Sequence, residues 1–384
     1  MERNMHKEST DVFGPEYVVR VKDAALGMEG FLVIHNTALG PGKGGIRMTA
    51  NVTEEEVTRL AATMTWKNAL AGIPFGGAKA GMRWPGGTDE KKKAFVESFA
   101  RLLKPFLVKK YIAGPDVQSG EREMQWFVEA AGNWRAATGK PANYCMSVFG
   151  GEGEKCGIPH EFGSTGFGVA HAARVAAELA GISMKGATVA VHGFGNVGTF
   201  AYQFLTEMGA KAVALADARG AVYAKDGFPR RMVGKVIAHH TPLLRALPSN
   251  RIAPEAFWKA PVDILIPASV TDVIHAGNKD GIRAKIIVEA GNIPMREPIE
   301  RELWEKGILI VPDFVANAGG VISSYAEYRG YNPKRMFELV ERKIVQATSA
   351  VLKKSMRTKR NPRAVALEIA QKRVEAAMQK KSGD

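Results

Sequence analysis

The chain has 384 residues, of which 46% are hydrophobic, so it is long enough for two or three domains with cores of their own. No run approaches the roughly 18 apolar residues that span a bilayer, and the first residues do not resemble a secretory signal. Two cysteines are too few for a disulfide framework. We therefore expect a cytoplasmic protein without a membrane partner. The net charge of +14 suggests nucleic acid, but the densest basic run, residues 353–360, has no aromatic side chains for base stacking, and we interpret it as a solvated linker.

The first quarter of the chain contains three lysines in unusual surroundings. Lys43 lies in GPGKGGIRM and Lys79 in PFGGAKAG, where glycines let backbone or ligand approach closely. Lys67 falls in a helix predicted to begin with a capping box at Thr53 and to end at Gly72. Its spacing from apolar neighbours places it on the interior stripe of that helix, or snorkelling at the edge of the stripe. Together the three lysines indicate a pocket for an anion.

Lys79 has the surroundings of a catalytic lysine. A lysine that is desolvated near other cations has its ammonium form disfavoured, so its pKa falls towards the working pH. Downstream, residues 111–116 are predicted to form a short strand that runs into a turn at Asp116. A lone aspartate in this place has two interpretations, a proton carrier or a turn cap.

Residues 187–217 carry the pattern of a dinucleotide-binding unit. A buried strand over 187–192 is followed by GFGNVG, a GxGxxG motif, and by a helix whose N-terminus can receive a pyrophosphate. A second strand over 212–216 ends at Asp217, about 20 residues after the last glycine, where this fingerprint has its ribose-binding acid. Further apolar strands, which extend a parallel sheet, are predicted at 262–266, 285–289 and 308–312.

Four segments in order carry a family resemblance. They are GKGGIRM, LAATMTWKNALAGIPFGGAKAG, GPDVQSGEREM and PDFVANAGGVISSYAEY, and the resemblance runs from roughly residue 15 to 335. The chain resembles the amino-acid dehydrogenase family that contains glutamate, leucine, phenylalanine and valine dehydrogenases. The resemblance implies a two-domain α/β fold, with an α/β substrate-binding and oligomerisation domain (1–158 with 356–384) and a Rossmann-type NAD(P)-binding domain with a mostly parallel sheet (159–355).

The resemblance also implies a separate task for each lysine. In the family, the lysine at the Lys67 position holds the substrate's α-carboxylate, and the lysine at the Lys79 position is catalytic with the aspartate at the Asp116 position. Lys43 and Ser324 resemble the pair that holds the γ-carboxylate in the glutamate enzymes, whereas the leucine and phenylalanine enzymes have apolar groups there. Without Lys43, Ser324 would be an ordinary helix serine. The expected substrate-binding residues are Lys43, Met64, Lys67, Val321 and Ser324.

The implied reaction is the reversible NAD(P)-dependent oxidative deamination of L-glutamate to 2-oxoglutarate and ammonium, through 2-iminoglutarate. Asp116 would receive a proton from the amino group, and Lys79, neutral part of the time, would activate the water that attacks the imine. The reaction is expected in the cleft between the domains. One alternative is a leucine/valine or phenylalanine dehydrogenase on the same scaffold, and another is a catalytically silent cofactor-sensing or nucleic-acid-binding protein.

Asp217 and Arg219 favour different cofactors. A carboxylate suits the ribose hydroxyls of NAD and repels the extra phosphate of NADP, whereas an arginine can pair with that phosphate. We expect NAD(P) with a slight preference for NADP, and no metal, because the sequence has no CxxC pair and no histidine cluster. The expected cofactor-binding residues are Gly193, Gly195, Asn196, Val197, Gly198, Asp217, Arg219, Asn292 and Asn317.

The sequence departs from the family pattern in two places. Glu161 stands where the glutamate enzymes have an arginine before the cofactor domain, and Glu289 precedes Ala290 where the family has glycine. Asn292 keeps the amide that is expected near the cofactor. Because family members are homo-oligomers, most often hexamers among the glutamate enzymes, we also expect a homo-oligomer.

Overall fold

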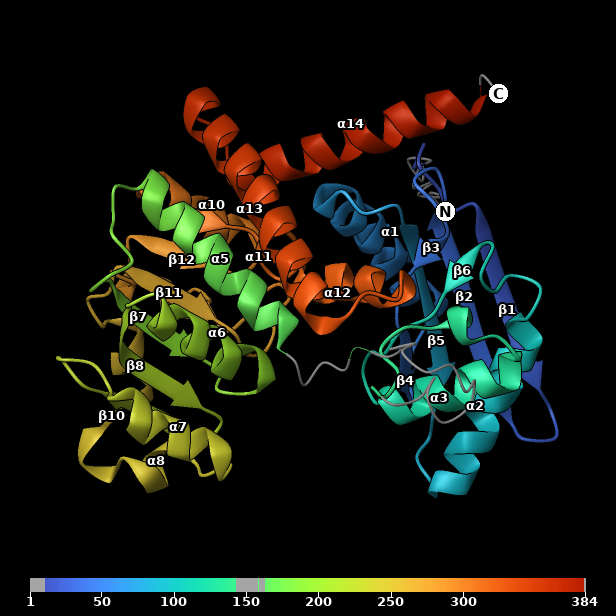
Figure 1. Ribbon diagram of the computed structural model, residues 1–384, viewed down its shortest axis with the longest axis horizontal. Coiled ribbons are helices and arrows are strands. Elements are labelled where there is room, and N and C mark those ends of the chain that lie inside the picture. Colours follow the sequence, from blue (N-terminus) through green and yellow to red (C-terminus); the bar gives the residue numbers. More distant parts are fainter. Residues whose placement is uncertain (1–10, 143–157, 159–162, 383–384) are drawn as a thin grey trace, which may run out of the picture. The chain divides into compact units, whose positions relative to one another are not determined.

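The computed structural model describes residues 11–142, 158 and 163–382, and the chain divides into two compact units (Figure 1). Unit 1 comprises Met1–Ala69, Ile73–Gly157 and Gln371–Asp384, and unit 2 comprises Leu70–Gly72 and Ile158–Ala370. The return to unit 1 therefore falls at Gln371, later than the expected residue 356.

Unit 1 is built on a mixed sheet with β5 at its centre. The strands are β1 (Tyr17–Asp23), β2 (Met28–Asn36), β3 (Gly42–Lys43), β4 (Ile46–Thr49), β5 (Gly76–Arg83) and β6 (Tyr111–Ile112). The order is β1-β2-β5-β3-β6, and β4 also pairs with β5. β2 is antiparallel to β5, whereas β3 and β4 run parallel to successive stretches of it.

Helices cover both faces of this sheet. They are α1 (Glu54–Ala71), α2 (Asp89–Leu103), α3 (Glu121–Ala131) and the 3-10 turn η1 (Trp134–Ala136). On one face, Val57 and Ala61 of α1 pack against Phe31 and Val33 of β2. On the other face, the aromatic side chains of α2 and α3 pack against the even-numbered residues of β5 in the main core of the unit. β5 is therefore buried from both sides, although it is rich in glycine.

Unit 2 is built on a mostly parallel sheet. The strands are β7 (Thr188–His192), β8 (Lys211–Asp217), β9 (Gly220–Tyr223), β10 (Arg251–Ile252), β11 (Ile264–Pro267), β12 (Ile286–Val288) and β13 (Leu309–Val311). Their order is β10-β9-β8-β7-β11-β12-β13. Within this described sheet β9 pairs antiparallel with both β8 and β10, and the other neighbouring strands are parallel. The strand order reverses beside β7, which places a ligand crevice at the carboxyl ends of the strands. The prediction of an α/β fold with a Rossmann-type sheet is confirmed.

Unit 2 also contains helices, and the last of them, α14, ends in unit 1. They are α5 (Ser164–Leu179), α6 (Asn196–Glu207), α7 (Arg230–Ala238), α8 (Leu243–Ala246), α9 (Pro254–Trp258), α10 (Glu297–Glu305), α11 (Asp313–Ala316), α12 (Gly319–Tyr328), α13 (Pro333–Thr358) and α14 (Pro362–Ser382), with 3-10 turns η3 (Pro248–Asn250) and η4 (Lys279–Gly281). α5 packs on β12 and β13, and α6 on β7 and β8. Phe257 of α9 and Leu303 of α10 share a core with Leu265 and Ile287. No helix in the described ranges combines the length and apolar character that a bilayer crossing needs.

The basic run at 353–360 is mostly helical. α13 continues to Thr358 and ends at Lys359, which has a left-handed backbone with φ of 51°. Lys354 and Arg360 both pair with Glu368 of α14, at 2.9 and 2.7 Å. The interpretation of the whole run as a linker was therefore wrong, because the apolar periodicity of α13 extends through most of it.

Candidate active site

Close backbone approaches in unit 1 explain why the segments around Lys43 and Lys79 are rich in glycine. β5 pairs with β3 at its start and with β4 from Ala80 onward, so Lys79 lies between the two pairings. A Cβ atom on Gly44 would lie 1.7 Å from the carbonyl oxygen of Ala78, and one on Gly45 would lie 2.8 Å from the Cβ of Asp116. Only glycine at these two positions lets the segment between β3 and β4 pass between β5 and the turn that carries Asp116.

Lys79 and Asp116 form a buried ion pair. The Lys79 Nζ lies 3.0 Å from the Asp116 Oδ1, and the two side chains are 7% and 20% exposed. The turn is fastened to β4, since the Asp116 N–H donates to the Ser119 Oγ and that hydroxyl donates to the Ile46 carbonyl oxygen. The structure thus brings together the two residues that sequence analysis assigned to catalysis.

Arg47 is a third member of this cluster, and the sequence analysis missed it. Its Nε donates to the Asp116 Oδ2 at 2.8 Å, and its Nη1 lies 2.5 Å from the Glu56 Oε1. Glu56 therefore completes no capping box: its N–H donates to the Thr53 hydroxyl as expected, but its carboxylate pairs with Arg47. The alternation of β4 carries a signal, because Arg47 lies between two buried apolar residues and must point to the opposite face.

The three charges set the protonation of the pair. Burial lowers the pKa of Lys79 and the charge of Arg47 adds to this effect, while the attraction of Asp116 opposes it. Burial alone would raise the pKa of Asp116, but Lys79 and Arg47 hold it below its ordinary value. Asp116 is therefore a carboxylate at neutral pH, and Lys79 gives up its proton more readily than an exposed lysine. This arrangement suits proton transfer.

The expected substrate-binding residues of unit 1 lie on β3 and α1. Lys43 is 3% exposed, and its Nζ donates to the carbonyl oxygen of Ala113 at 2.8 Å. A side chain at Gly114 would collide with that nitrogen, since its Cβ would lie 2.4 Å away. Met64 and Lys67 are both half-buried on α1. The ammonium of Lys43 is therefore held next to the strand that leads to the turn with Asp116.

A cleft of about 990 Å³ in unit 2 opens at the carboxyl ends of β7 and β8. Its walls include the GxGxxG loop from Gly193 to Asn196, which caps α6. A Cβ on Gly198 would lie 1.8 Å from the Gly193 carbonyl oxygen, so glycine is needed there for the turn. A Cβ on Gly195 would meet nothing within 4 Å and would project into open space. The loop and the helix N-terminus therefore fit the pyrophosphate of a dinucleotide.

Asp217 has a structural task that its position in the motif did not indicate. Its two carboxylate oxygens accept the backbone N–H groups of Arg219 and Leu243, each at 2.8 Å. The aspartate thereby fastens the start of α8 to the end of β8. Arg219 is exposed and lines the same cleft, together with His240. Asn196 is exposed and Val197 half-buried at the first turn of α6.

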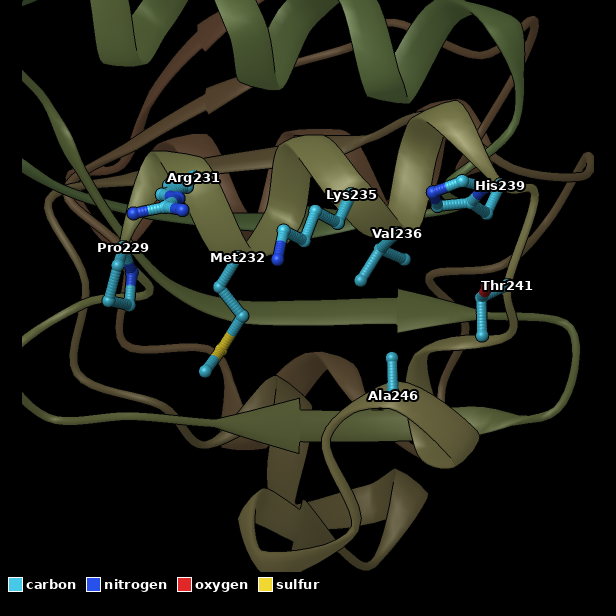
Figure 2. Close-up of a pocket in the computed structure, with 8 residues that line it drawn as sticks. All are labelled: Pro229, Arg231, Met232, Lys235, Val236, His239, Thr241 and Ala246. Atoms are coloured by element: carbon cyan, nitrogen blue, oxygen red, sulfur yellow. The ribbon is translucent and has the colours of Figure 1, made fainter.

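A smaller cleft of about 460 Å³ adjoins the dinucleotide cleft and shares Val236 and Thr241 with it. Figure 2 shows Met232 and Val236 pointing from α7 towards the segment that carries Ala246. Its lining also includes the cationic side chains of α7, Arg231 and Lys235.

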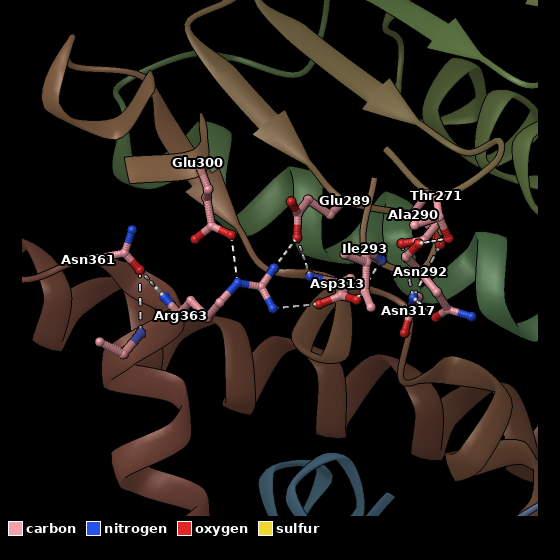
Figure 3. Close-up of polar contacts among 12 residues, drawn as sticks. Thr271, Glu289, Ala290, Asn292, Ile293, Glu300, Asp313, Asn317, Asn361 and Arg363 are labelled. Atoms are coloured by element: carbon pink, nitrogen blue, oxygen red, sulfur yellow. Dashed lines mark hydrogen bonds and ion pairs between the residues drawn. The ribbon is translucent and has the colours of Figure 1, made fainter. Parts of the chain in front are cut away.

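Asn292 and Asn317 belong to a network that ends on a buried arginine (Figure 3). The Asn317 Nδ2 donates to the Asn292 Oδ1 at 3.0 Å, and the next residue, Ile293, donates its N–H to Asp313. Arg363, at the start of α14, pairs with three carboxylates of unit 2 at 2.6 to 2.9 Å, those of Glu289, Glu300 and Asp313. Glu289, which departs from the family pattern, is therefore a partner of this arginine.

The remaining expected residues lie on α12 or outside the described ranges. Val321 and Ser324 are half-buried on α12 in unit 2, whereas Lys43 belongs to unit 1. Glu161 lies outside the described residues.

Comparisons with known proteins agree with this architecture. Residues 15–133 match the Glu/Leu/Phe/Val dehydrogenase dimerisation domain, and residues 156–382 match the Glutamate/Leucine/Phenylalanine/Valine dehydrogenase family. The chain is 37% identical to a glutamate dehydrogenase of Aeropyrum pernix, over 90% of this chain and 84% of that protein. It is 40% identical to an NADP(+)-dependent glutamate dehydrogenase of Pyrobaculum calidifontis, over 78% of this chain and 72% of that protein.

A solved structure shows the same fold. The hetero-hexameric glutamate dehydrogenase of Thermus thermophilus in its leucine-bound form superimposes with a TM-score of 0.80 at 26% identity, covering 96% of this chain and 90% of that one. The paired Lys79 and Asp116 and the dinucleotide cleft agree with the family matches to both halves of the chain. This chain therefore belongs to the glutamate/leucine/phenylalanine/valine dehydrogenase family.

Proposed function

We propose that this chain, by its family an NAD(P)-dependent amino-acid dehydrogenase, acts on L-glutamate and converts it reversibly to 2-oxoglutarate and ammonium. The observation that carries the chemistry is the buried pair of Lys79 and Asp116, with its nitrogen and oxygen 3.0 Å apart. Support for the substrate comes from the relatives, several of which are glutamate dehydrogenases at 33 to 40% identity.

The unit 1 residues would handle the protons of the reaction. Asp116, kept as a carboxylate by its two cationic neighbours, takes a proton from the substrate's amino group. Lys79, whose pKa burial lowers, then activates the water that attacks C2 of 2-iminoglutarate, and collapse releases ammonia. A bound nicotinamide cofactor would supply the acceptor for the hydride that leaves the substrate's Cα. Lys67 would hold the α-carboxylate during these steps.

The choice of glutamate rests on the far end of the substrate. We assign its γ-carboxylate to Lys43, a buried ammonium of unit 1, while the part of Ser324 stays a prediction from the family resemblance. Leucine offers no acceptor to the ammonium of Lys43, and a site built to bind a polar substrate group rejects an analogue that lacks this group by as much as about 10⁴-fold.

For the cofactor we propose NAD(P) with a preference for NADP. Asp217 uses both carboxylate oxygens on backbone N–H groups, and Arg219 and His240 line the same cleft. These donors suit a 2′-phosphate. The similar glutamate dehydrogenases include both NADP-specific and NAD-specific enzymes, so the preference rests on this chain's own residues. We further propose a homo-oligomer, a hexamer, that works in the cytoplasm.

An amination assay tests these proposals. Oxidation of NADH and of NADPH is followed with ammonium and a panel of 2-oxo acids, and we expect the highest kcat/KM with 2-oxoglutarate and NADPH. Lys79→Ala should reduce kcat by at least about 10³-fold with an unchanged circular dichroism spectrum, whereas Lys22→Ala, which removes an exposed lysine of β1, should leave kcat unchanged. Faster turnover of 4-methyl-2-oxopentanoate than of 2-oxoglutarate would replace glutamate by leucine as the substrate.

A further inference from the structure

Arg47 contacts the catalytic pair but has no part in the proposed chemistry. Its guanidinium donates to one oxygen of Asp116, while Lys79 holds the other oxygen of the same carboxylate. Each oxygen of Asp116 therefore has a cation of its own, and the two cations approach from different strands, β4 and β5. The plane of the carboxylate is fixed by two points of attachment instead of one.

The register of the sheet places Arg47 on this face. Ile46 pairs with Ala80 and Arg47 with Gly81, so the side chain of Arg47 leaves the sheet on the same side as that of Lys79. Gly81 provides the room: a Cβ there would lie 2.7 Å from the Cγ2 of Val57 on α1. The arginine thus occupies the space between the sheet and the first turns of α1.

Glu56 holds the other end of the guanidinium. Its Oε1 lies 2.5 Å from the Arg47 Nη1, and the two side chains are 32% and 22% exposed. Glu56 thereby forms a bridge from α1 through Arg47 to Asp116. The bridge places a defined positive charge next to the reacting groups, with Glu56 balancing part of it.

We propose that Arg47 is a positioning residue for the reaction, which orients the Asp116 carboxylate towards the substrate and holds a positive charge against the pair of Lys79 and Asp116. Its role rests on the function proposed above, because a positioning residue needs a reaction to position. The charged groups that face the pair are Arg47 from β4 and Glu56 from α1, and Tyr111 of β6 is neutral because burial raises its pKa.

Loss of Arg47 should raise the pKa of both Asp116 and Lys79. The arginine lowers the pKa of Asp116 and, through its charge, that of Lys79. Since deamination uses both groups without their protons, Arg47→Gln should move the rising limb of the pH profile of kcat/KM for deamination to higher pH. We expect the limb to shift by about one pH unit, at the lower end of the roughly one to three units that an arginine produces in an adjacent aspartate, because Arg47 acts on Lys79 only through its charge.

Arg47→Lys separates charge from geometry. Lysine keeps the positive charge but cannot hold Asp116 and Glu56 with a planar fork. The rising limb of the pH profile of Arg47→Lys should stay within about 0.3 pH units of that of the wild type. Its kcat on the plateau should fall about tenfold, because the Asp116 carboxylate is less well oriented. The matched control is Arg20→Gln, which removes an exposed arginine that pairs with Glu54 on the same turn of α1, and it should leave both quantities unchanged.

A second measurement does not depend on turnover. Acetylation of Lys79 by acetic anhydride, followed across pH by mass spectrometry of the peptides, reports the pH at which half of the amine reacts. In Arg47→Gln this pH should rise relative to the wild type and to Arg20→Gln. An unchanged acetylation profile and an unchanged limb in Arg47→Gln would overturn the proposal, as would a limb in Arg47→Lys that moves as far as in Arg47→Gln. A wild-type protein without dehydrogenase activity would contradict the proposed function, while the acetylation profile would still test Arg47.

Discussion

Arg363 is the residue whose replacement tests the electrostatics of unit 2 most sharply. Its guanidinium is 14% exposed and binds three carboxylates, of which those of Glu289 and Glu300 are at most 1% exposed. Removing one partner of a buried ion pair leaves charge without compensation and costs about 3–5 kcal/mol. For a unit of this size, each kcal/mol lowers the unfolding midpoint by about 2–4 °C, so Arg363→Met should lower it by about 10 °C.

The loss should depend on pH, with a sign that follows from the carboxyl groups. Burial raises the pKa of Glu289 and of Glu300 above their ordinary value of 4.5, although Arg363 opposes this. A group whose pKa is higher in the folded than in the unfolded protein stabilises the fold at low pH, and that stability is lost as pH rises through the folded pKa. Without Arg363 the pKa values of Glu289 and Glu300 rise further, so the variant continues to lose folding stability up to a higher pH. The deficit of Arg363→Met should be small at pH 5 and largest near pH 8.

The assay is thermal unfolding at a fixed scan rate, followed by circular dichroism at pH 5 and pH 8. Arg360→Met is the matched control, because Arg360 is 50% exposed and pairs with Glu368 at the surface, an arrangement worth about 0–1 kcal/mol. Adding Glu300→Gln to Arg363→Met should recover part of the loss at pH 8, since it removes one buried charge. Equal losses for the two arginine variants, or a loss that does not grow with pH, would refute the reasoning.

Four other substitutions test the substrate, the cofactor and the packing. Lys43→Leu should raise KM for glutamate by about 100-fold in the deamination assay, and an unchanged KM would remove Lys43 from the γ-carboxylate site. Arg219→Ser should lower kcat/KM with NADPH by about tenfold and leave that with NADH unchanged; equal effects on both would assign Arg219 a structural role. Gly77→Ala should destabilise the fold by about 1–3 kcal/mol, because its Cβ would lie 2.2 Å from the backbone nitrogen of Thr65. Gly234→Ala, where nothing lies within 4 Å of the new Cβ, should by contrast stabilise α7 by up to about 1 kcal/mol, as measured by urea unfolding.

Local patterns in the sequence predicted the elements and the motif residues. The helix that carries Lys67 ends at Ala71, just before Gly72, because glycine adopts the left-handed φ of 63° found there. The strand, glycine loop and helix of the dinucleotide site occur where GFGNVG places them, since turn chemistry and apolar periodicity act over a few residues. Lys79 and Asp116 were likewise predicted as candidates from residue type and setting, and the family resemblance assigned their roles.

Which side chains meet depends on tertiary packing. Arg47 and Asp116 are 69 positions apart, and Arg363 and Glu289 are 74 apart, so nothing in their local sequence indicates the contact. Strand register decides the first pair, because a shift by one residue would turn Arg47 to the other face of the sheet. Packing decides the second, since it gathers three carboxylates around one guanidinium, and their mutual attraction offsets the cost of removing these charges from water. Local sequence patterns therefore specify the helices, the strands and the types of reactive side chain, whereas long-range pairing specifies how the charges around those side chains are arranged.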